Sequence, residues 1–556
     1  MKKLFFLLTG IFCANIVFGQ NYVSPELVAP VVIENLVANP EKPSGFRLAN
    51  VDFLTSSPDY ASSAMIVDSV GEIVWRYTSP LNLTGRAGSI FNFKRINDTT
   101  MVWYTFENGP GYYLVLNNDY SVRDTVNSIG NVGRMRPHDL LILPNGNYLS
   151  MANVFQRIDS SLHGIEVKPG IILDSSISTI ENIWIQEINT NGNLLKEWQS
   201  LDYVNPVATW DTSKISSNTG VKILHTNSLD YFFNQGQLKL LTSNRESNEL
   251  MIIDWNTGSI EERIGGRNAT MSFVASLYSG DKLDLYGQHY AKVYSWDEIN
   301  QKLLVRVFNN KYNQSQAEAW VIDIDLTNGI IRKNVEIIST PKLLSTHLGN
   351  FDNYKGDNWV VNWGRTYSGR ENATGYNRFG QKQFNLFLPD SVDSYRILPV
   401  ETDEMDALKA NRPVITQNGC TLTASSTGYW SDGTTFGNEF PVIDTGIYFI
   451  ETKYGIGWIR SQKVVIETTN NECGTVGVSE LNSTEKISIY PNPTTGKVYV
   501  QNVETGETIR LIDMMGKEIF SQTVSNANAE IDISKFSAGV YFLITKSGQS
   551  TKVIKR

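Results

Sequence analysis

Residues 250–264 read LMIIDWNTGSIEERI, and related segments recur along the chain. Each has an apolar run, a turn rich in Asp, Asn and Gly, and a second run of strand-forming residues. Short apolar runs separated by such turns indicate antiparallel β-strands. The related segments are SAMIVDSVGEIVWRY (63–77), YYLVLNNDYSVRDTV (112–126), IWIQEINTNGNLLKEW (183–198) and AWVIDIDLTNGIIRKNV (319–335).

These segments belong to a longer repeat, whose copies lie about 45 to 85 residues apart, a spacing that suits four-stranded units with added loops. Such repeats are typical of a β-propeller, in which blades close into a ring around a central channel. We count about six blades between residues 45 and 400 and therefore predict an all-β fold with a six-bladed β-propeller. Because the inner strands of all blades line the channel, residues far apart in the sequence can form one site.

The N-terminus, MKKLFFLLTGIFCANIVFGQ, combines two lysines, an apolar stretch and the small residue Gly19. This pattern predicts a secretory signal peptide over residues 1–19. The apolar stretch is short for a membrane anchor, and no later run is long enough to span a bilayer, so we predict no transmembrane segment. Lipidation at Cys13 is the less favoured alternative, because further apolar residues follow it.

Charge and cysteine content narrow the classes of function. The formal net charge is −9, and no long basic run precedes the closing KVIKR, which argues against nucleic-acid binding. After removal of the signal peptide only Cys420 and Cys473 remain. Two cysteines in an exported chain favour one disulfide, with two unpaired thiols as the alternative.

The composition changes after residue 400. An acidic stretch predicts a linker or short helix, and Tyr448 then ends a D-x-G-x-Y pattern that favours a small immunoglobulin-like β-sandwich. The predicted order is a signal peptide (1–19), an N-terminal segment (20–44), the propeller (45–400), a linker (401–412), the immunoglobulin-like module (413–475) and a C-terminal β-sandwich (485–556).

The C-terminal segment contains ISIYPNPTTGKVYVQN (487–502), the strand GVYFL (539–543) and a basic end. It resembles the type A sorting domain of the type IX secretion system of Bacteroidetes. That resemblance implies export across the outer membrane by the type IX machinery, often with removal of this domain and attachment to the cell surface. The expected location is therefore secreted or on the outer cell surface.

Histidine is rare in this chain, and four of the five histidines open successive copies of the repeat. They are His138 in RPHDLLILPNGNYL, His225 in LHTNSLDYF, His289 in YGQHYAKVYSW and His347 in STHLGNFDNY. If these positions begin the innermost strands, four imidazoles meet in one central pocket. His163 lies in a long connection, and we interpret it as an ordinary loop residue.

One arginine completes this set. Arg245 follows one strand after His225, and its planar fork of donors suits sulfate, phosphate or carboxylate oxygens. Asn227 is expected on the same face of the strand as His225, whereas alternation is expected to turn Glu246 away from Arg245. Neutral histidine is a nucleophile and an acid or base near pH 7, so this set can transfer a sulfuryl group without a cofactor.

The segments HDLLILPNGNYL (138–149), HTNSLDY (225–231), SNRESNELMIID (243–254) and YGQHYA (286–291) resemble the bacterial arylsulfate sulfotransferases. The resemblance covers roughly residues 40 to 400. It implies a six-bladed propeller with an added N-terminal β domain that moves sulfate from a phenolic ester to another phenol without a nucleotide sulfate donor. The expected partners are therefore a small aryl sulfate donor and a phenol acceptor.

The resemblance also assigns residues. His289 matches the histidine that becomes transiently sulfated, and His225, Asn227 and Arg245 match the residues that grip the sulfate. His138 matches a further active-site histidine, interpreted as an acid/base or orienting group. At the next blade, His347 has no firm match in the family, and Thr346 is the alternative residue facing the pocket. Two departures are Pro137, where many relatives have a second histidine, and Glu246, an acid beside the arginine.

Two other functions stay open from the residues alone. Four histidines from separate blades also hold iron in oxygenases, and imidazole suits iron, zinc or copper. Arg245 beside the pocket argues against this metal-dependent oxygenase, because it would repel a cation. A non-enzymatic propeller that binds protein or glycan at the cell surface is the second alternative, since a fold does not fix a function.

Overall fold

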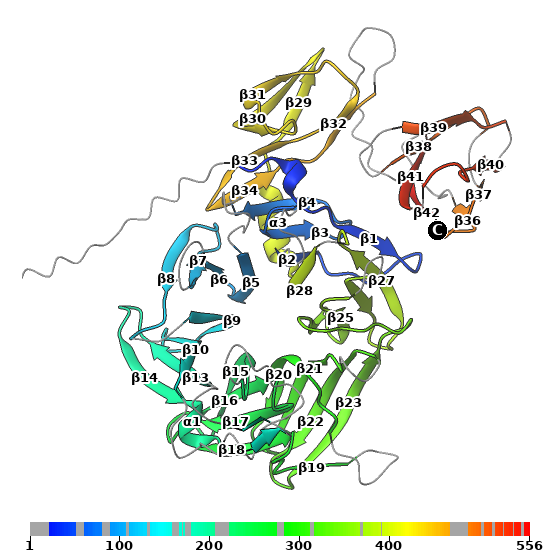
Figure 1. Ribbon diagram of the computed structural model, residues 1–556. Coiled ribbons are helices and arrows are strands. Elements are labelled where there is room, and N and C mark those ends of the chain that lie inside the picture. Colours follow the sequence, from blue (N-terminus) through cyan, green and yellow to red (C-terminus); the bar gives the residue numbers. More distant parts are fainter. Residues whose placement is uncertain are drawn as a thin grey trace, which may run out of the picture. The chain divides into compact units, whose positions relative to one another are not determined.

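The computed structural model is almost entirely β-structure and forms two compact units, residues 1–476 and 477–556 (Figure 1). The predicted signal peptide, His163 and Cys473 lie outside the residues that it describes. The described residues are 22–555, without 52–59, 80–88, 107–110, 131–133, 158–165, 169–170, 173–178, 206–221, 275–282, 312–315, 367–370, 391, 468–487, 502–504, 514–517, 526–527, 538 and 546–549.

Most of the first unit consists of antiparallel four-stranded sheets, which we call blades. Five of them follow the chain order within the sheet. They are β5 (Ser89–Asn97), β6 (Thr100–Phe106), β7 (Tyr112–Leu116) and β8 (Val122–Val126); β9 (Arg134–Ile142), β10 (Tyr148–Gln156), β13 (Ile180–Ile188) and β14 (Leu194–Gln199); β15 (Thr226–Asn234), β16 (Gln237–Asn244), β17 (Glu249–Asp254) and β18 (Ile260–Gly265); β20 (His289–Asp297), β21 (Lys302–Asn309), β22 (Glu318–Asp325) and β23 (Ile330–Ile338); β24 (Asn350–Tyr354), β25 (Asn358–Asn362), β26 (Ala373–Tyr376) and β27 (Lys382–Phe387).

The remaining blade joins the two ends of the propeller. Strand β28 (Asp393–Val400) pairs with β2 (Gly45–Val51), and β3 (Ser63–Asp68) and β4 (Ile73–Thr78) continue this sheet outward. Strand β1 (Val32–Asn35) belongs to the preceding blade, where it pairs with β27. The first strands β5, β9, β15, β20 and β24 contact one another in turn, and β28 contacts both β24 and β5. The propeller prediction is confirmed, and these sheets are compatible with six blades.

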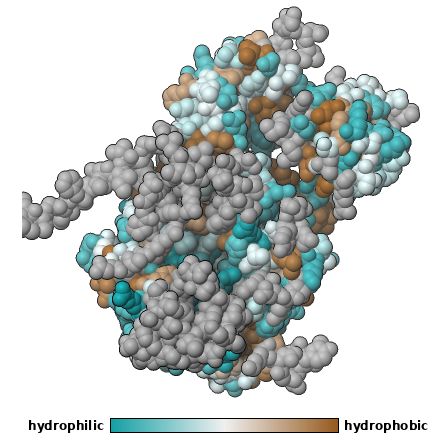
Figure 2. Space-filling model, in the orientation of Figure 1, coloured by the Kyte–Doolittle hydropathy of each residue, from teal (hydrophilic) through white to brown (hydrophobic). Residues whose placement is uncertain are grey.

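The core lies between consecutive blades. Strands β4 and β17 are buried along their whole length, because each blade is covered on both faces by its neighbours. Leu241 and Leu250 of one blade, for example, pack with Val305 and Ile322 of the next. This explains why the repeats read as nearly continuous apolar runs. Large exposed hydrophobic residues are scattered, and Figure 2 shows hydrophobic and hydrophilic residues intermixed over the described surface.

The predicted immunoglobulin-like module continues the sheet of one blade. Its strand β34 (Gly457–Arg460) pairs with β4, and β33 (Ile450–Tyr454), β30 (Thr421–Trp430) and β29 (Ile415–Asn418) follow, with β31 (Phe436–Pro441) beside β30. Strands β32 (Gly446–Tyr448) and β35 (Val464–Ile466) form a second small sheet. Tyr448 donates to the Asp444 carbonyl at 2.7 Å, as a tyrosine corner does. Cys420 is disulfide-bonded.

Two buried ionic contacts fasten the parts of the first unit together. At the β4–β34 seam, Glu451 accepts hydrogen bonds from Arg76 and Arg460, which hold the pKa of this carboxyl down to about 2 against the effect of burial. The stretch predicted as a linker contains a helix, α3 (Thr402–Ala410), whose Glu404 pairs with Arg47 at 2.5 Å. Residues 401–412 are therefore packed against the propeller.

The second unit is a small β-sandwich, as predicted. One sheet contains β36 (Ser488–Tyr490), β37 (Lys497–Gln501) and β40 (Asn528–Asp532), and the other contains β38 (Thr508–Ile512), β39 (Glu518–Thr523), β41 (Gly539–Thr545) and β42 (Ser550–Lys555). Val498, Leu511, Ile531 and Leu543 belong to its core. Among all described residues, no helix has the length and apolar character that a membrane span requires.

Candidate active site

The four predicted histidines lie in, or shortly before, the innermost strands of four consecutive blades. His138 lies within β9, His225 directly precedes β15, His289 is the first residue of β20, and His347 precedes β24. The rings of His138 and His225 meet edge to face with their centroids 5.6 Å apart. His289 lies within electrostatic range of both His138 and His347. The structure therefore brings the four imidazoles together at one end of the channel.

His289 has a ring whose protonation is fixed by its neighbours. Its Nδ1 lies 2.6 Å from Oδ1 of Asn310 and 3.0 Å from the carbonyl oxygen of Gly287. Both partners are acceptors, so Nδ1 carries the proton and Nε2 carries the lone pair of the neutral ring. Burial and the charge of Arg245 hold the pKa of His289 well below its usual range, although the Asn310 contact opposes this. At neutral pH the ring is therefore uncharged and chemically able to act as a nucleophile through Nε2.

His225 has the opposite tautomer. The guanidinium of Arg136 can only donate, and its Nη2 lies 3.1 Å from Nδ1 of His225, so this nitrogen accepts and Nε2 carries the proton. Burial, followed by the charges of Arg136 and Arg245, holds the pKa of His225 well below its usual range. His225 therefore presents an N–H donor, whereas His289 presents a lone pair.

The backbone of His225 is held in an unusual conformation. Its φ of 46° lies in the left-handed region, which residues other than glycine adopt at a cost in free energy. Two contacts hold this conformation: the His225 N–H donates to a Glu181 carboxylate oxygen at 3.0 Å, and its carbonyl accepts from the Arg245 N–H at 3.3 Å. The contacts thereby fix the positions of His225 and Arg245 relative to each other.

His138 is bound to a tyrosine from the closing strand. Its Nδ1 lies 2.5 Å from the hydroxyl of Tyr395 in β28, and its Nε2 is buried with no hydrogen-bond partner among the described residues. Burial, then the charges of Arg136, His289 and Arg396, hold the pKa of His138 well below its usual range. His138 is therefore also neutral at pH 7 while the pocket contains no added charge.

Arg245 lies beside Glu246, so the expectation that Glu246 faces away from Arg245 is wrong. Nη1 of Arg245 lies 2.6 Å from Oε1 of the buried Glu246. The alternation argument fails because residues 245–248 form the turn between β16 and β17 rather than an extended strand. Nη2 of Arg245 donates to the Thr346 carbonyl at 3.4 Å. The guanidinium is thus tied to its own turn and to the start of another blade.

Asn227 has contacts with the chain that the sequence did not indicate. Its Nδ2 donates to the main-chain carbonyl of Gln288 at 2.6 Å, directly before His289, and its side chain is buried. Asn227 is therefore placed to position the histidine of the neighbouring blade.

Thr346 and His347 contact each other through Oγ1 and Nδ1 at 2.8 Å. Burial, followed by the charges of Arg365 and Arg245, lowers the pKa of His347 to about 4.

Two arginines and two acids surround the histidines. Arg136 lies 3.7 Å from Glu181 and Arg245 lies 2.6 Å from Glu246, yet all four histidines have lowered pKa values in part because of nearby cations. A metal cation would meet the same repulsion. Within the described ranges, no group of three or more His, Cys, Asp or Glu side chains is arranged to hold a metal ion.

Sequence reasoning missed four contact residues. Arg136 lies two positions before His138 in the same strand, so alternation could have indicated it. Glu181, Asn310 and Tyr395 come from other strands or from a strand end, and no local pattern marks them. Their place beside the histidines depends on the register of the blades.

A profile of the arylsulfotransferase family (ASST) matches residues 36–325, which is 290 of the 556 residues and just over half of the chain. A profile of the secretion system C-terminal sorting domain matches residues 488–556. No curated protein matches the chain in sequence.

Similar solved structures share little sequence with this chain. Dihydro-heme d1 dehydrogenase NirN in complex with DHE is 12% identical with a TM-score of 0.31, over 68% of this chain and 81% of that one. Virginiamycin B lyase from Staphylococcus aureus is 10% identical with a TM-score of 0.30, over 71% and 95%. The Dos1 propeller is 11% identical with a TM-score of 0.27, over 95% and 96%. None of these similarities bears on the site.

Proposed function

Because the chain belongs to the arylsulfotransferase family, we propose that it moves a sulfuryl group from a phenolic sulfate ester to a phenol through a sulfated histidine. The donor and the acceptor are small aromatic molecules. The reaction uses neither a nucleotide sulfate donor nor a bound cofactor. Three tasks have to be performed: nucleophilic attack on sulfur, binding of the sulfuryl oxygens, and protonation of the leaving phenolate.

The nucleophile of this proposal is His289, and the fixed tautomer of its ring is the observation that carries it. The Nε2 lone pair attacks sulfur, a nitrogen–sulfur bond forms, and the bond from sulfur to the aryl oxygen breaks with its electron pair leaving on the phenolate. The ring becomes cationic while Nδ1 keeps its proton. The Nδ1–H bonds to Asn310 and Gly287 then strengthen, because a charged donor makes the stronger hydrogen bond.

The sulfuryl oxygens are bound by donors on the neighbouring blade. Arg245 supplies a guanidinium, and His225 supplies its Nε2–H because Arg136 occupies Nδ1. Asn227 acts in this proposal by positioning the chain before His289. These groups are arranged before substrate arrives, so little reorganisation accompanies the transfer.

Proton transfer is assigned to His138. In the empty pocket, burial and neighbouring cations keep its ring neutral, which makes it a poor acid. A bound sulfate ester brings a negative charge that offsets these cations and raises the pKa of the histidine. His138 then donates a proton to the departing phenolate. In the second half-reaction it removes a proton from the incoming phenol, whose oxygen attacks the sulfur and releases His289.

The place of the reaction follows from the sorting domain. The match over residues 488–556 supports secretion to the cell surface through the type IX system. We propose that the propeller acts there on aryl sulfates outside the cell, after removal of a signal peptide over residues 1–19.

The test follows nitrophenol release from 4-nitrophenyl sulfate by the purified chain, with and without phenol, in EDTA. Release should depend on phenol and survive the chelator. Without an acceptor, peptide mass spectrometry should find one SO3 group on His289. His289→Gln should abolish both signals, while His163→Gln serves as the matched histidine control. Full turnover by His289→Gln, or release that requires added metal, contradicts the proposal.

A further inference from the structure

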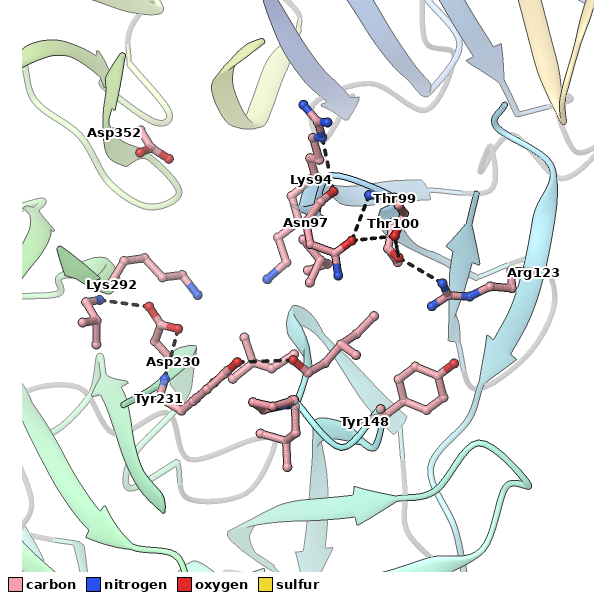
Figure 3. Close-up of a pocket in the computed structure, with 18 of the residues that line it drawn as sticks. Lys94, Asn97, Thr99, Thr100, Arg123, Tyr148, Asp230, Tyr231, Lys292 and Asp352 are labelled. Carbon is pink, nitrogen blue, oxygen red and sulfur yellow. Dashed lines mark hydrogen bonds between the residues drawn. The ribbon is translucent and has the colours of Figure 1, made fainter. Parts of the chain in front are cut away.

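A cavity of about 1010 Å³ lies among the inner strands of the propeller (Figure 3). It is lined by residues of the inner strands, among them Lys94 of β5, Leu141 of β9, Asp230 of β15 and Lys292 of β20. None of its lining residues is one of the four histidines, and His138, His225 and His289 come earlier in the sequence than the lining residues of β9, β15 and β20. The cavity is therefore separate from the candidate active site and is not used by the proposed transfer reaction.

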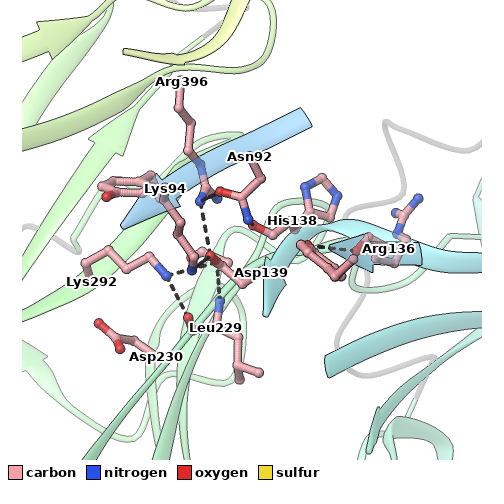
Figure 4. A network of polar contacts seen from close by, with 12 residues as sticks. Asn92, Lys94, Arg136, His138, Asp139, Leu229, Asp230, Lys292 and Arg396 are labelled. Carbon is pink, nitrogen blue, oxygen red and sulfur yellow. Dashed lines mark hydrogen bonds and ion pairs between the residues drawn. The ribbon is translucent and has the colours of Figure 1, made fainter. Parts of the chain in front are cut away.

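A buried charge cluster forms the floor of the cavity (Figure 4). The carboxylate of Asp139 lies 2.7 Å from Nζ of Lys94, 2.9 Å from Nζ of Lys292 and 3.1 Å from Nη1 of Arg396. It also accepts the N–H of Leu229 at 3.0 Å. One carboxylate thus faces three cations, each from a different blade. The floor of the cavity carries more positive than negative charge.

The acids in the cavity wall reduce this positive excess without removing it. Asp230, which accepts main-chain N–H groups of Tyr231 and Val293 at 3.0 and 2.9 Å, adds a single negative charge. Asp352 pairs with Arg306, so their charges offset each other. The pKa of Lys94 is lowered to about 8, chiefly by burial, and the neighbouring Lys292 and Arg396 add to this against Asp139. Positive charge is therefore crowded here although the whole chain is acidic.

The remaining wall adds a further cation away from the floor. Arg123 lines the cavity, and its Nη1 donates to Oγ1 of Thr100 at 3.0 Å, whereas Arg95, which also lines the cavity, is paired with Asp403 at 3.0 Å. Between these cations lie the rings of Tyr148 and Tyr231 (Figure 3). The lining residues of this large cavity carry their charges at several separated points and not at one.

We propose that this cavity binds an oligosaccharide that carries several sulfate or carboxylate groups. Separated cations suit a ligand with repeated negative charges, because each can form its own charge-assisted hydrogen bond. Side chains of Asn97, Thr99 and Thr100 suit sugar hydroxyls, and the tyrosine rings suit the apolar faces of sugars. A small inorganic anion would use only part of this lining.

The test is titration calorimetry on the full chain with four probes at equal ionic strength: a fully sulfated tetrasaccharide, tetragalacturonate, a neutral glucose tetrasaccharide and inorganic sulfate. At least one charged tetrasaccharide should bind, more tightly than the neutral sugar and than sulfate. The two charged probes separate a sulfate preference from a carboxylate preference. Arg123→Glu should weaken this binding about tenfold, since it replaces a charged hydrogen bond with repulsion. Arg332→Gln, in a strand outside the cavity lining, is the control.

Further variants separate this site from the active site. Arg245→Gln should leave tetrasaccharide binding unchanged, and Arg123→Glu should leave the KM for 4-nitrophenyl sulfate unchanged. Absence of binding by both charged tetrasaccharides would overturn the proposal. Loss of binding in Arg245→Gln, or equal losses in Arg123→Glu and Arg332→Gln, would overturn it too. None of these outcomes depends on whether the chain transfers sulfate.

Discussion

Replacing Asn310 by alanine tests the central step of the proposed reaction. Oδ1 of Asn310 accepts the His289 Nδ1–H at 2.6 Å, and the Gly287 carbonyl accepts it at 3.0 Å. A neutral hydrogen bond contributes about 0.5–1.5 kcal/mol and one to a charged group about 1.5–3 kcal/mol. The bond changes from the first class to the second as the ring becomes cationic. The difference, about 1–1.5 kcal/mol, predicts a roughly tenfold loss of kcat/KM for Asn310→Ala.

The assay measures kcat/KM for 4-nitrophenyl sulfate with excess phenol, together with the melting temperature. Nδ2 of Asn310 also donates to Ser345 Oγ and to the Leu348 carbonyl, so some stability is lost and has to be separated from catalysis. Asn310→Asp keeps an acceptor and adds a negative charge. It should retain turnover and raise the pKa of His289, which moves the acidic fall in rate to higher pH.

Two results would refute this reasoning. An unchanged kcat/KM in folded Asn310→Ala would show that Asn310 does not stabilise the cationic ring. A loss as large as that of His289→Gln in a folded protein would show that Asn310 has a role beyond orienting the ring, because the Gly287 contact remains.

The other predictions use the same assays. Glu246→Gln should lower the KM for aryl sulfates severalfold with little change in kcat, since the acid at 2.6 Å competes with the sulfate for Arg245; a raised KM would contradict this. In the wild type, kcat/KM should stay level below pH 6.5, because burial and Arg245 depress the pKa of His289; a fall centred near the ordinary histidine value would count against a neutral, shielded ring. The free energy of unfolding should decline as the pH falls below about 6.5, because the histidines bind protons in the unfolded chain while the buried histidines of the folded chain stay neutral. An unchanged free energy of unfolding down to pH 5 would contradict the depressed pKa values. Glu451→Ala should destabilise the first unit by about 3–5 kcal/mol, since it leaves two buried arginines uncompensated, whereas exposed Glu439→Ala should not; equal melting temperatures would refute this.

The sequence predicted the propeller and the convergence of the histidines because both depend on periodicity. Each blade repeats one pattern, so a histidine at one position of the pattern recurs at one place around the axis. The contacts that set the tautomers could not be found in this way. Asn310 follows the end of β21, and Tyr395 comes from the closing strand, so their distances to the histidines depend on how blades pack.

Local rules also failed where the chain leaves regular structure. Alternation predicted that Glu246 faces away from Arg245, but it applies only to extended strands, and this segment is a turn. The acidic stretch before the immunoglobulin-like module predicted a linker or a helix. Composition did not reveal that Glu404 of this helix would be buried on Arg47, because that contact joins residues 357 positions apart.

The pairing of β28 with β2 determines when the propeller is able to fold. The innermost strand of the blade that begins at residue 45 comes from residues 393–400, so this blade stays incomplete until almost the entire propeller sequence is available. Contacts of such sequence separation form slowly. Until β28 pairs with β2, the ring of blades stays open. Tyr395, which arrives with the last strand, makes the formation of the histidine pocket coincide with closure of the ring.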